Sequence, residues 1–195
     1  MIATTISDSH PKPVRLTEVE KKSLQKEVSQ NITAYDYFLR AREIFNKSNG
    51  TKIDMENALR LVNLAIQLDS NFSRAYALKG SIWYNLSSLG VSQKTWHDSA
   101  MYFSAKAISA DASSPDGYIV QGDVHRSLGK LDLAKADYYN AYKIAPNDPS
   151  VLLSYGWQLM IERDERGADL ILKSNENQFS LKDPEYYMAL SRSYA

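Results

Sequence analysis

The sequence of 195 residues contains no cysteine and only three histidines, which lie far apart at His10, His97 and His125. The absence of cysteine excludes disulfides, thiolate catalysis and cysteine-based zinc sites, but it leaves the cellular compartment open. No two histidines have the spacing of metal ligands on one element. We therefore expect neither a metal nor a cofactor.

An excess of charge of either sign is also missing, since 23 Lys and Arg residues balance 23 Asp and Glu residues. This balance argues against a nucleic-acid partner and against binding to an anionic membrane surface. No run of apolar residues is long enough to span a membrane, and residues 1–10 lack the basic start and apolar core of a signal peptide. We expect a soluble protein and assign it to the cytoplasm by default.

Signatures of catalysis are missing as well. No glycine-rich phosphate loop follows a strand pattern, and the carboxylates are scattered over helical segments. His125 has no acidic residue or second histidine one turn away on its own helix, so we interpret it as a core residue rather than a ligand or general base. We interpret Asp137 as a solvated helix position. The prediction is that this chain is not an enzyme.

The most regular stretch covers residues 115–148, which read PDGYIVQGDVHRSLGKLDLAKADYYNAYKIAPND. Its spacing is that of two helices joined by a turn at Gly129. Two antiparallel helices approach closely only where one of them contributes no bulk. We therefore expect Gly122 on the first helix to meet the small face of the second helix, which carries Ala134 and Ala141.

The rest of the chain can be read as further copies of this unit. Small residues recur at Ala41, Ala58 and Ala65 in the first copy, at Gly80, Ala100 and Ala107 in the second, and at Gly156 and Ala168 in the fourth, where Asn175 replaces the second alanine. The copies span about 34–71, 73–112, 115–148 and 149–182, with a partial copy at 184–195. Residues 1–16 are expected to form a flexible tail or linker and residues 17–30 a charged lead-in helix, so the repeat domain covers 31–195.

Helix-start signals support this division independently. The pairs Ser114-Pro115, Asp148-Pro149 and Asp183-Pro184 each offer a side chain that can cap a helix, followed by proline at the first helical position. The three prolines are 34 and 35 residues apart. In the first copy we expect Asp54 to cap the second helix.

The repeated pattern resembles the tetratricopeptide repeat, or TPR, over about residues 34–195. The resemblance implies an all-α fold, namely a right-handed superhelix of about four helix pairs plus an unpaired C-terminal helix. One such pair cannot bury its own apolar face, so each pair stacks on the next. The first helices then line a concave groove, and the family implies recognition of a protein or peptide partner.

Groove-facing places on the first helices give the candidate contact residues. They are Tyr35, Phe38, Arg42, Phe45, Arg74, Ser81, Tyr84, Asp123, Arg126, Trp157, Met160 and Arg192. This mixture of aromatic residues, methionine and arginine is typical of binding hot spots. The alternatives are that Phe38 and Phe45 pack internally, that Arg42, Asp123 and Arg126 form ordinary surface salt bridges, and that Trp157 and Met160 are covered by the missing partner of the last helix or by a second copy of the chain.

One TPR subclass clamps the C-terminal carboxylates of its partners with Lys and Asn. Here the corresponding places hold Phe38, Arg42, Leu78, Asp116 and Val120, so that clamp is absent.

A narrower resemblance lies in the run Ala-Tyr-Asp-Tyr at residues 34–37 and in the lengthened turns of the first two copies. They are similar to the TPR region of bacterial signalling proteins that carry an adenylate or guanylate cyclase, TolB-like or winged-helix domain. The implied role is a non-catalytic regulatory or scaffolding module. The alternative is self-assembly, such as a homodimer, through the last helix.

Overall fold

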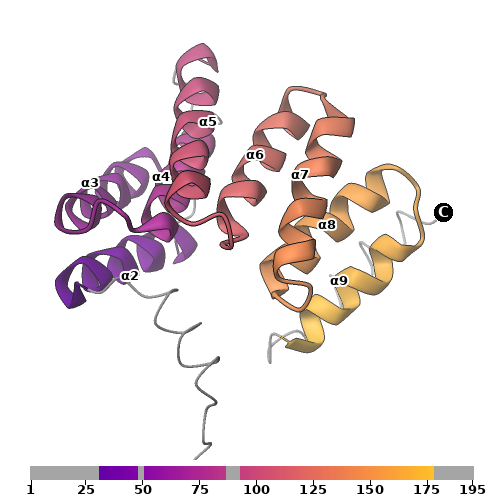
Figure 1. The fold of residues 1–195 in the computed structure, drawn as a ribbon. Helices are drawn as coiled ribbons and strands as arrows, with labels where there is room; N and C mark the ends of the chain where they lie inside the picture. Colours follow the sequence, from indigo (N-terminus) through magenta and orange to yellow (C-terminus); the bar gives the residue numbers. More distant parts are fainter. Residues whose placement is uncertain (1–30, 48–50, 87–92, 178–195) are drawn as a thin grey trace, which may run out of the picture.

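The structure, a computed structural model, describes residues 31–47, 51–86 and 93–177. Within these ranges the chain forms eight helices and no strand, which confirms the predicted all-α fold (Figure 1). The helices are α2 (Ile32–Lys47), α3 (Lys52–Leu68), α4 (Ser73–Leu86), α5 (Gln93–Ala110), α6 (Asp116–Ser127), α7 (Leu131–Ile144), α8 (Pro149–Ile161) and α9 (Arg166–Asn177). The lead-in helix expected at 17–30 and the last helix expected at 184–195 lie outside the described residues.

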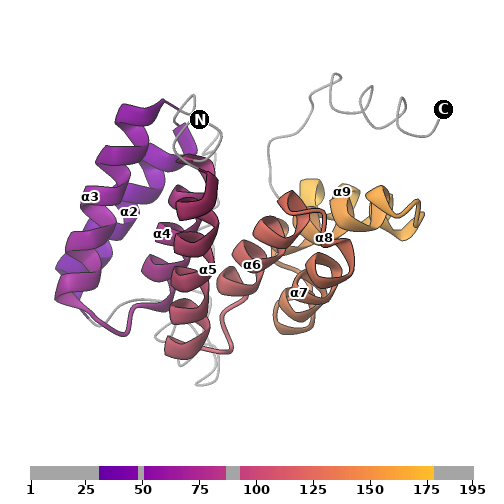
Figure 2. The same ribbon diagram turned by 90° about the horizontal axis from the view of Figure 1, so that it is seen from above.

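Consecutive helices form antiparallel pairs, and the pairs follow one another through the molecule. Packing is closest within α2–α3, α4–α5, α6–α7 and α8–α9, and each pair also contacts the next. Figures 1 and 2 show this order as a steady progression of colour from indigo at α2 to yellow at α9. The chain is therefore a solenoid in which each pair covers the apolar face of its neighbour.

Close approach within the pairs occurs at the three predicted glycines. A Cβ at Gly80 would lie 3.3 Å from the Ala100 carbonyl oxygen on α5, and one at Gly156 would lie 2.9 Å from the Gly167 carbonyl oxygen on α9. At Gly122 the contact differs from the expectation, because the added Cβ would meet the Tyr138 ring at 2.5 Å rather than the alanines of α7. Tyr138 fills the space that the alanines leave on that face.

The small face of α9 is shifted by one residue from its expected position. Gly167 and Ser174 are buried, whereas Ala168 and Asn175 are only partly buried. The close contact of α9 with Gly156 falls at Gly167, 11 residues later along the chain, so the small face of α9 begins one residue earlier than expected. The register prediction for this helix was therefore wrong by one position.

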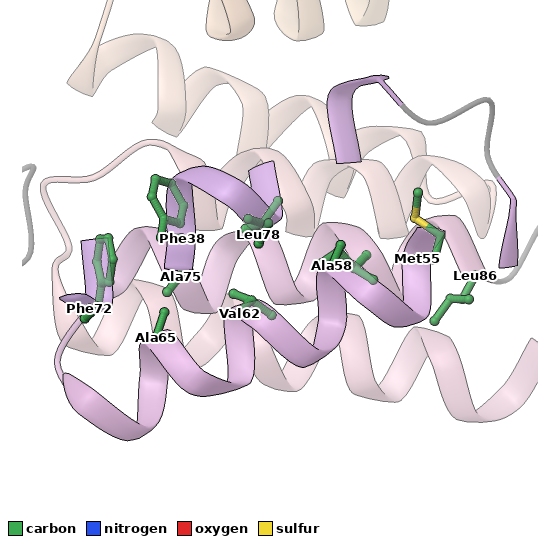
Figure 3. Close-up of a cluster of buried hydrophobic side chains, with 12 residues drawn as sticks. Phe38, Met55, Ala58, Val62, Ala65, Phe72, Ala75, Leu78 and Leu86 are labelled. Carbon is green, nitrogen blue, oxygen red and sulfur yellow. The ribbon is translucent and has the colours of Figure 1, made fainter. Parts of the chain in front are cut away.

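The largest hydrophobic cluster joins α2, α3 and α4 (Figure 3). Its alanines let the helices approach, and its large side chains fill the space between them; they are Phe38, Met55, Val62, Phe72, Leu78, Ile82 and Leu86. Complete burial of each large side chain stabilises the fold by about 1.5–3 kcal/mol. This cluster anchors the N-terminal end of the row of first helices.

Two helix starts differ from the predicted caps and one agrees. The Asp148 carboxylate accepts hydrogen bonds from the backbone N–H groups of Ser150 and Val151 at 2.8 and 3.1 Å, as expected for an N-cap. At α6, no side chain caps the helix, and the Ser114 hydroxyl instead donates to Asp116. At α3 the cap is Thr51, whose hydroxyl oxygen accepts from the backbone N–H of Asp54, so Asp54 lies inside the helix.

Candidate protein-binding surface

The candidate contact residues lie on α2, α4, α6 and α8, the first helix of each pair. Their spacing along each helix, three or four residues per step, places them on one helical face. We call this face the first-helix surface; its described candidates are Tyr35, Arg42, Phe45, Arg74, Ser81, Tyr84, Asp123, Arg126, Trp157 and Met160. Arg192 lies outside the described residues.

Phe38 is a core residue, so its assignment as a contact residue was wrong. Only 2% of it is exposed, and its ring centroid lies 4.9 Å from that of Phe72 within the α2–α4 cluster. Phe45 is partly buried and packs against the same cluster. The sequence spacing grouped the candidates on one helical face, but it could not show that neighbouring side chains close over Phe38.

Two arginines cover Phe38 from different helices. The guanidinium carbons of Arg42 on α2 and Arg74 on α4 lie 5.5 and 5.6 Å from the centroid of the Phe38 ring, within the range of a cation–π interaction. Arg74 also forms an ion pair with Asp116 on α6, with its Nε 3.3 Å from Oδ2. Arg42 forms no ion pair with any residue in the described part of the chain.

A polar cluster around Asp123 joins α4, α6 and α7. The Asp123 carboxylate accepts a hydrogen bond from the Tyr138 hydroxyl at 2.7 Å and another from Arg126 at 2.9 Å. Arg126 in turn lies over the Tyr138 ring and hydrogen-bonds to Tyr84. Asp123 and Arg126 are therefore held largely by partners inside the molecule.

Burial raises the pKa values of two groups in this cluster, the Asp123 carboxyl and the Tyr138 hydroxyl. Loss of solvent raises the pKa of the Asp123 carboxyl, and the hydrogen bond from Tyr138 and the charge of Arg126 oppose that rise. Burial and the charge of Asp123 also raise the pKa of Tyr138, so its hydroxyl keeps its proton and donates. The cluster therefore fixes side chains of α6 against α7. It offers little free charge to a binding partner.

The α8 end of the first-helix surface is apolar. Trp157 is 37% exposed and belongs to none of the described hydrophobic clusters. Met160 is partly buried beside Gly167, and Leu153, at the matching place one turn earlier, is partly buried as well. Of all the candidates, Trp157 presents the largest apolar side chain to its surroundings.

His125 is largely buried, as expected, but the role expected for Asp137 was wrong. His125 Nδ1 lies 2.6 Å from Asp137 Oδ2, and the two side chains are 17% and 15% exposed. Asp137 lies on the facing helix α7. A search for acidic residues one turn away from His125 on α6 could not find it. Among the described residues no group of three His, Asp or Glu side chains could hold a metal ion.

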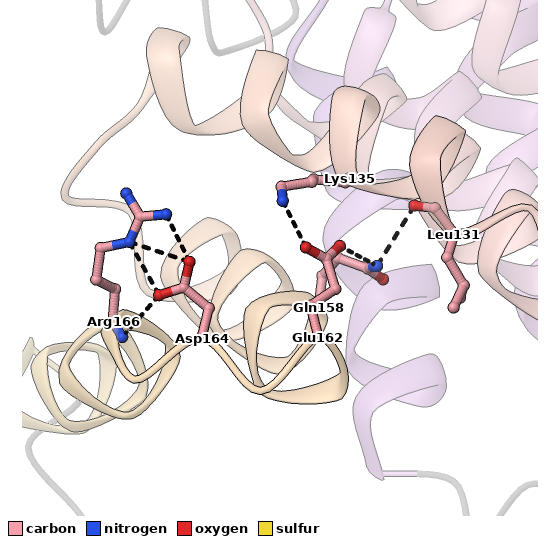
Figure 4. Close-up of polar contacts among 6 residues, drawn as sticks. All are labelled: Leu131, Lys135, Gln158, Glu162, Asp164 and Arg166. Atoms are coloured by element: carbon pink, nitrogen blue, oxygen red, sulfur yellow. Dashed lines mark hydrogen bonds and ion pairs between the residues drawn. The ribbon is translucent and has the colours of Figure 1, made fainter.

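Sequence analysis missed a second polar cluster, which links α7 to α8 (Figure 4). Lys135 Nζ lies 2.5 Å from Glu162 Oε2, and the Gln158 amide donates to Glu162 Oε1 at 3.0 Å. Gln158 is fully buried, and its Oε1 has no hydrogen-bond partner in the described part of the chain. Lys135 and Glu162 are 27 residues apart, as are Leu131 and Gln158, whose amide donates to the Leu131 carbonyl; helical spacing alone does not reveal contacts over this separation.

Solved structures resemble this fold over most of its length. The thermophilic TPR protein TTC0263 from Thermus thermophilus is 14% identical, with coverage of 90% of this chain and 88% of that one and a TM-score of 0.64. The first TPR of Spaghetti (RPAP3), bound to the HSP90 peptide SRMEEVD, is 15% identical, with 70% and 98% coverage and a TM-score of 0.51. A crystal structure of MamA is 18% identical, with 81% and 84% coverage and a TM-score of 0.50.

The fold is that of a TPR solenoid. At these identities the likeness establishes the arrangement of helices and no more. Neither a protein-family model nor a curated protein matches the sequence. None of the described helices of this TPR solenoid combines the length and apolar character that a membrane span requires.

Proposed function

We propose that this TPR solenoid is a non-catalytic module that binds a protein or peptide through its first-helix surface. The observation that carries the proposal is Trp157, a large aromatic side chain that is 37% exposed and packs into no described cluster. Arg42 and Tyr35 lie on the same surface, and Arg42 lacks an ion pair among the described residues. Tryptophan, tyrosine and arginine are the residues that contribute most to binding at protein interfaces.

The same fold holds a peptide in the Spaghetti structure, which supports binding as the role of this surface. The mode of binding proposed here differs from a carboxylate clamp. Phe38, Leu78 and Val120 stand at three of the clamp places and are at most 8% exposed, while Asp116 brings a negative charge to a fourth. A peptide that depends on clamped C-terminal carboxylates is therefore not the proposed partner.

We further propose that the module is the regulatory or scaffolding region of a larger bacterial signalling protein in the cytoplasm, such as an adenylate cyclase. This context depends on the sequence resemblance around residues 34–37 and on the lengthened turns. The reading frame that contains the sequence checks it directly. A cyclase, TolB-like or winged-helix domain encoded upstream is the expected result, and an unrelated upstream domain would remove the signalling context.

Selection of peptides on the full chain tests the binding function. A random twelve-residue library displayed on phage is selected on the wild-type chain, and the enriched peptides are synthesised and measured by fluorescence anisotropy. Trp157→Ala is expected to weaken their binding by about 2 kcal/mol or more, because it removes the largest aromatic contact of the proposed surface. Since Trp157 is partly exposed, the same change should lower the free energy of unfolding by less than about 1 kcal/mol.

Tyr102→Ala supplies the matched control. Tyr102 is an aromatic residue that is 57% exposed, but it lies on α5, a second helix, outside the first-helix surface. Its removal is expected to leave peptide affinity unchanged. If the library yields no binding peptide, or if the selected peptides bind both variants equally well, the first-helix surface is not a peptide-binding site.

A further inference from the structure

The two ends of the first-helix surface differ in charge, and this difference indicates what kind of peptide fits it. The following inference rests on the proposed function, because it concerns the partner of that same surface. At the α2 end the surface carries a positive charge, Arg42, that has no ion-pair partner among the described residues, and at the α8 end it carries apolar side chains. Between them, Arg74 of α4 pairs with Asp116 of α6, and Asp123 and Arg126 of α6 pair with each other.

The α2 end has more positive than negative charge. The guanidinium groups of Arg42 and Arg74 both lie over the ring of Phe38, at 5.5 and 5.6 Å, and within residues 31–47, 51–86 and 93–177 only Arg74 has a carboxylate partner, Asp116. Arg42 is held by the ring beneath it, so little side-chain freedom remains to be lost when it binds. A guanidinium binds a carboxylate through two parallel hydrogen bonds, which makes an acidic side chain its natural partner.

The middle of the surface offers little net charge. Arg74 pairs with Asp116, and Arg126 pairs with Asp123, which also accepts from Tyr138. A partner would have to break these contacts before it could use either charge. We therefore expect the middle of the surface to discriminate weakly among the residues of a bound peptide.

The α8 end favours an apolar side chain. The four matching places on this helix are Ser150, Leu153, Trp157 and Met160, and none of them is charged. Trp157 is 37% exposed and offers a broad ring face for aromatic or aliphatic contact. An acidic side chain has no cation to bind among these four residues.

The separation of the two ends sets the spacing within the peptide. The row of first helices leads from α2 to α4, α6 and α8 in three steps. If each step is given the 8–10 Å that separates directly packed helices, as α4 and α6 are, the two ends are separated by roughly 25–30 Å. An extended chain advances about 3.3 Å per residue, so the separation corresponds to about eight residues.

We propose that the partner is an extended peptide segment with an Asp or Glu side chain bound to Arg42 and, about eight residues away, an aromatic or large aliphatic side chain packed on Trp157. The acid is a side chain within the segment rather than a chain terminus. The peptide can run in either direction along the surface. The experiment below detects the acidic position whether it precedes or follows the apolar one.

The twelve-residue phage library tests this proposal when its peptides are fused to the coat protein through their C-termini, since no terminal carboxylate is then free. Selection on the full wild-type chain is expected to enrich an acidic position and an apolar position about eight residues apart. Selection on Arg42→Gln should lose the acidic position and keep the apolar one. Arg40→Gln is the matched control, because Arg40 lies on the same helix but pairs with Asp36 at the exposed surface.

Amidated synthetic peptides then give the effect of the single contact. Replacing the enriched Glu by Gln should weaken binding to the wild-type chain about tenfold, and it should have little effect on binding to Arg42→Gln. Peptides that bind through Trp157 but show no acidic preference, or an acidic preference that survives Arg42→Gln, would overturn this inference and leave the proposed function standing. A library that yields no binding peptide would overturn both.

Discussion

At the scale of single residues, the turns of the last two pairs show what a left-handed backbone costs. Gly129 (φ +71°) and Arg163 (φ +60°) occupy the same place, each seven residues after the glycine of its first helix. The next backbone N–H closes the turn in both cases, from Lys130 to His125 and from Asp164 to Leu159, at 2.9 Å each. Glycine adopts this conformation freely, whereas a residue with a Cβ is strained by about 1–2 kcal/mol.

Arg163→Gly is therefore expected to raise the free energy of unfolding by roughly 0.5–1 kcal/mol, because relief of strain exceeds the added freedom of the unfolded chain. Gly129→Ala should lower it by about 1 kcal/mol for the opposite reason. Chemical denaturation of both variants beside the wild type measures the two changes. If both variants changed the free energy of unfolding in the same direction, the backbone conformation would not control the stability of these turns.

The candidate contact residues also show how far sequence reasoning reaches. Helical spacing was enough to group them on one face, because that grouping follows from the geometry of a single helix. It could not show which of these side chains are buried by, or bonded to, residues of neighbouring helices. Phe38 is buried beneath Arg42 and Arg74, and Asp123 is bonded to Tyr138, because residues from different helices meet there.

At the scale of secondary-structure elements, the sequence predicted the pairing of helices better than their ends. Small residues and turn glycines recur at fixed spacing, so the pairs could be found from the sequence. The start of α3 was missed because Thr51 and Asp54 can both cap a helix. The register of α9 was missed because Gly167 and Ala168 are both small, and only the packing of α9 against α8 shows which of them faces Gly156.

The two Pro-containing helix starts that lie within the described residues provide a matched pair for measuring a cap. Asp148 accepts two backbone hydrogen bonds at the start of α8, whereas Ser114 accepts none at the start of α6. Asp148→Ala is expected to lower the free energy of unfolding by about 1 kcal/mol, and Ser114→Ala by a few tenths at most. Denaturation curves of the two variants make the comparison. Equal losses would mean that the cap geometry does not determine the stability of these helix starts.

At the scale of the whole molecule, stability depends on contacts between neighbours. Each helix pair packs on the pair before it and the pair after it, and polar contacts such as Lys135 with Glu162 reinforce the junction between the last two pairs. In an array of this kind the free energy is approximately a sum of repeat and interface contributions. A destabilising substitution in one helix pair should therefore lower the stability of that pair and its direct neighbours more than that of distant pairs.

Gly122→Val places such a defect at the centre of the solenoid. A Cβ at Gly122 would lie 2.5 Å from Tyr138 Cε1, and the ring cannot turn aside, because it is fully buried and its hydroxyl is bonded to Asp123. Helices α6 and α7 must then separate. We expect a loss of about 3 kcal/mol, since overpacking of a core typically costs 1–3 kcal/mol and the Asp123 contacts are lost as well.

Hydrogen exchange measured by mass spectrometry locates the damage from Gly122→Val. Amides of α6–α9 should lose protection while those of α2 and α3, whose core cluster contains no residue beyond Leu86, remain protected. Gln121→Val is the control, because it adds the same β-branched side chain to the neighbouring position of α6. Uniform loss of protection from α2 to α9 would show that the solenoid unfolds as one cooperative unit, whereas graded loss would mean that the N-terminal pairs fold without support from the C-terminal ones.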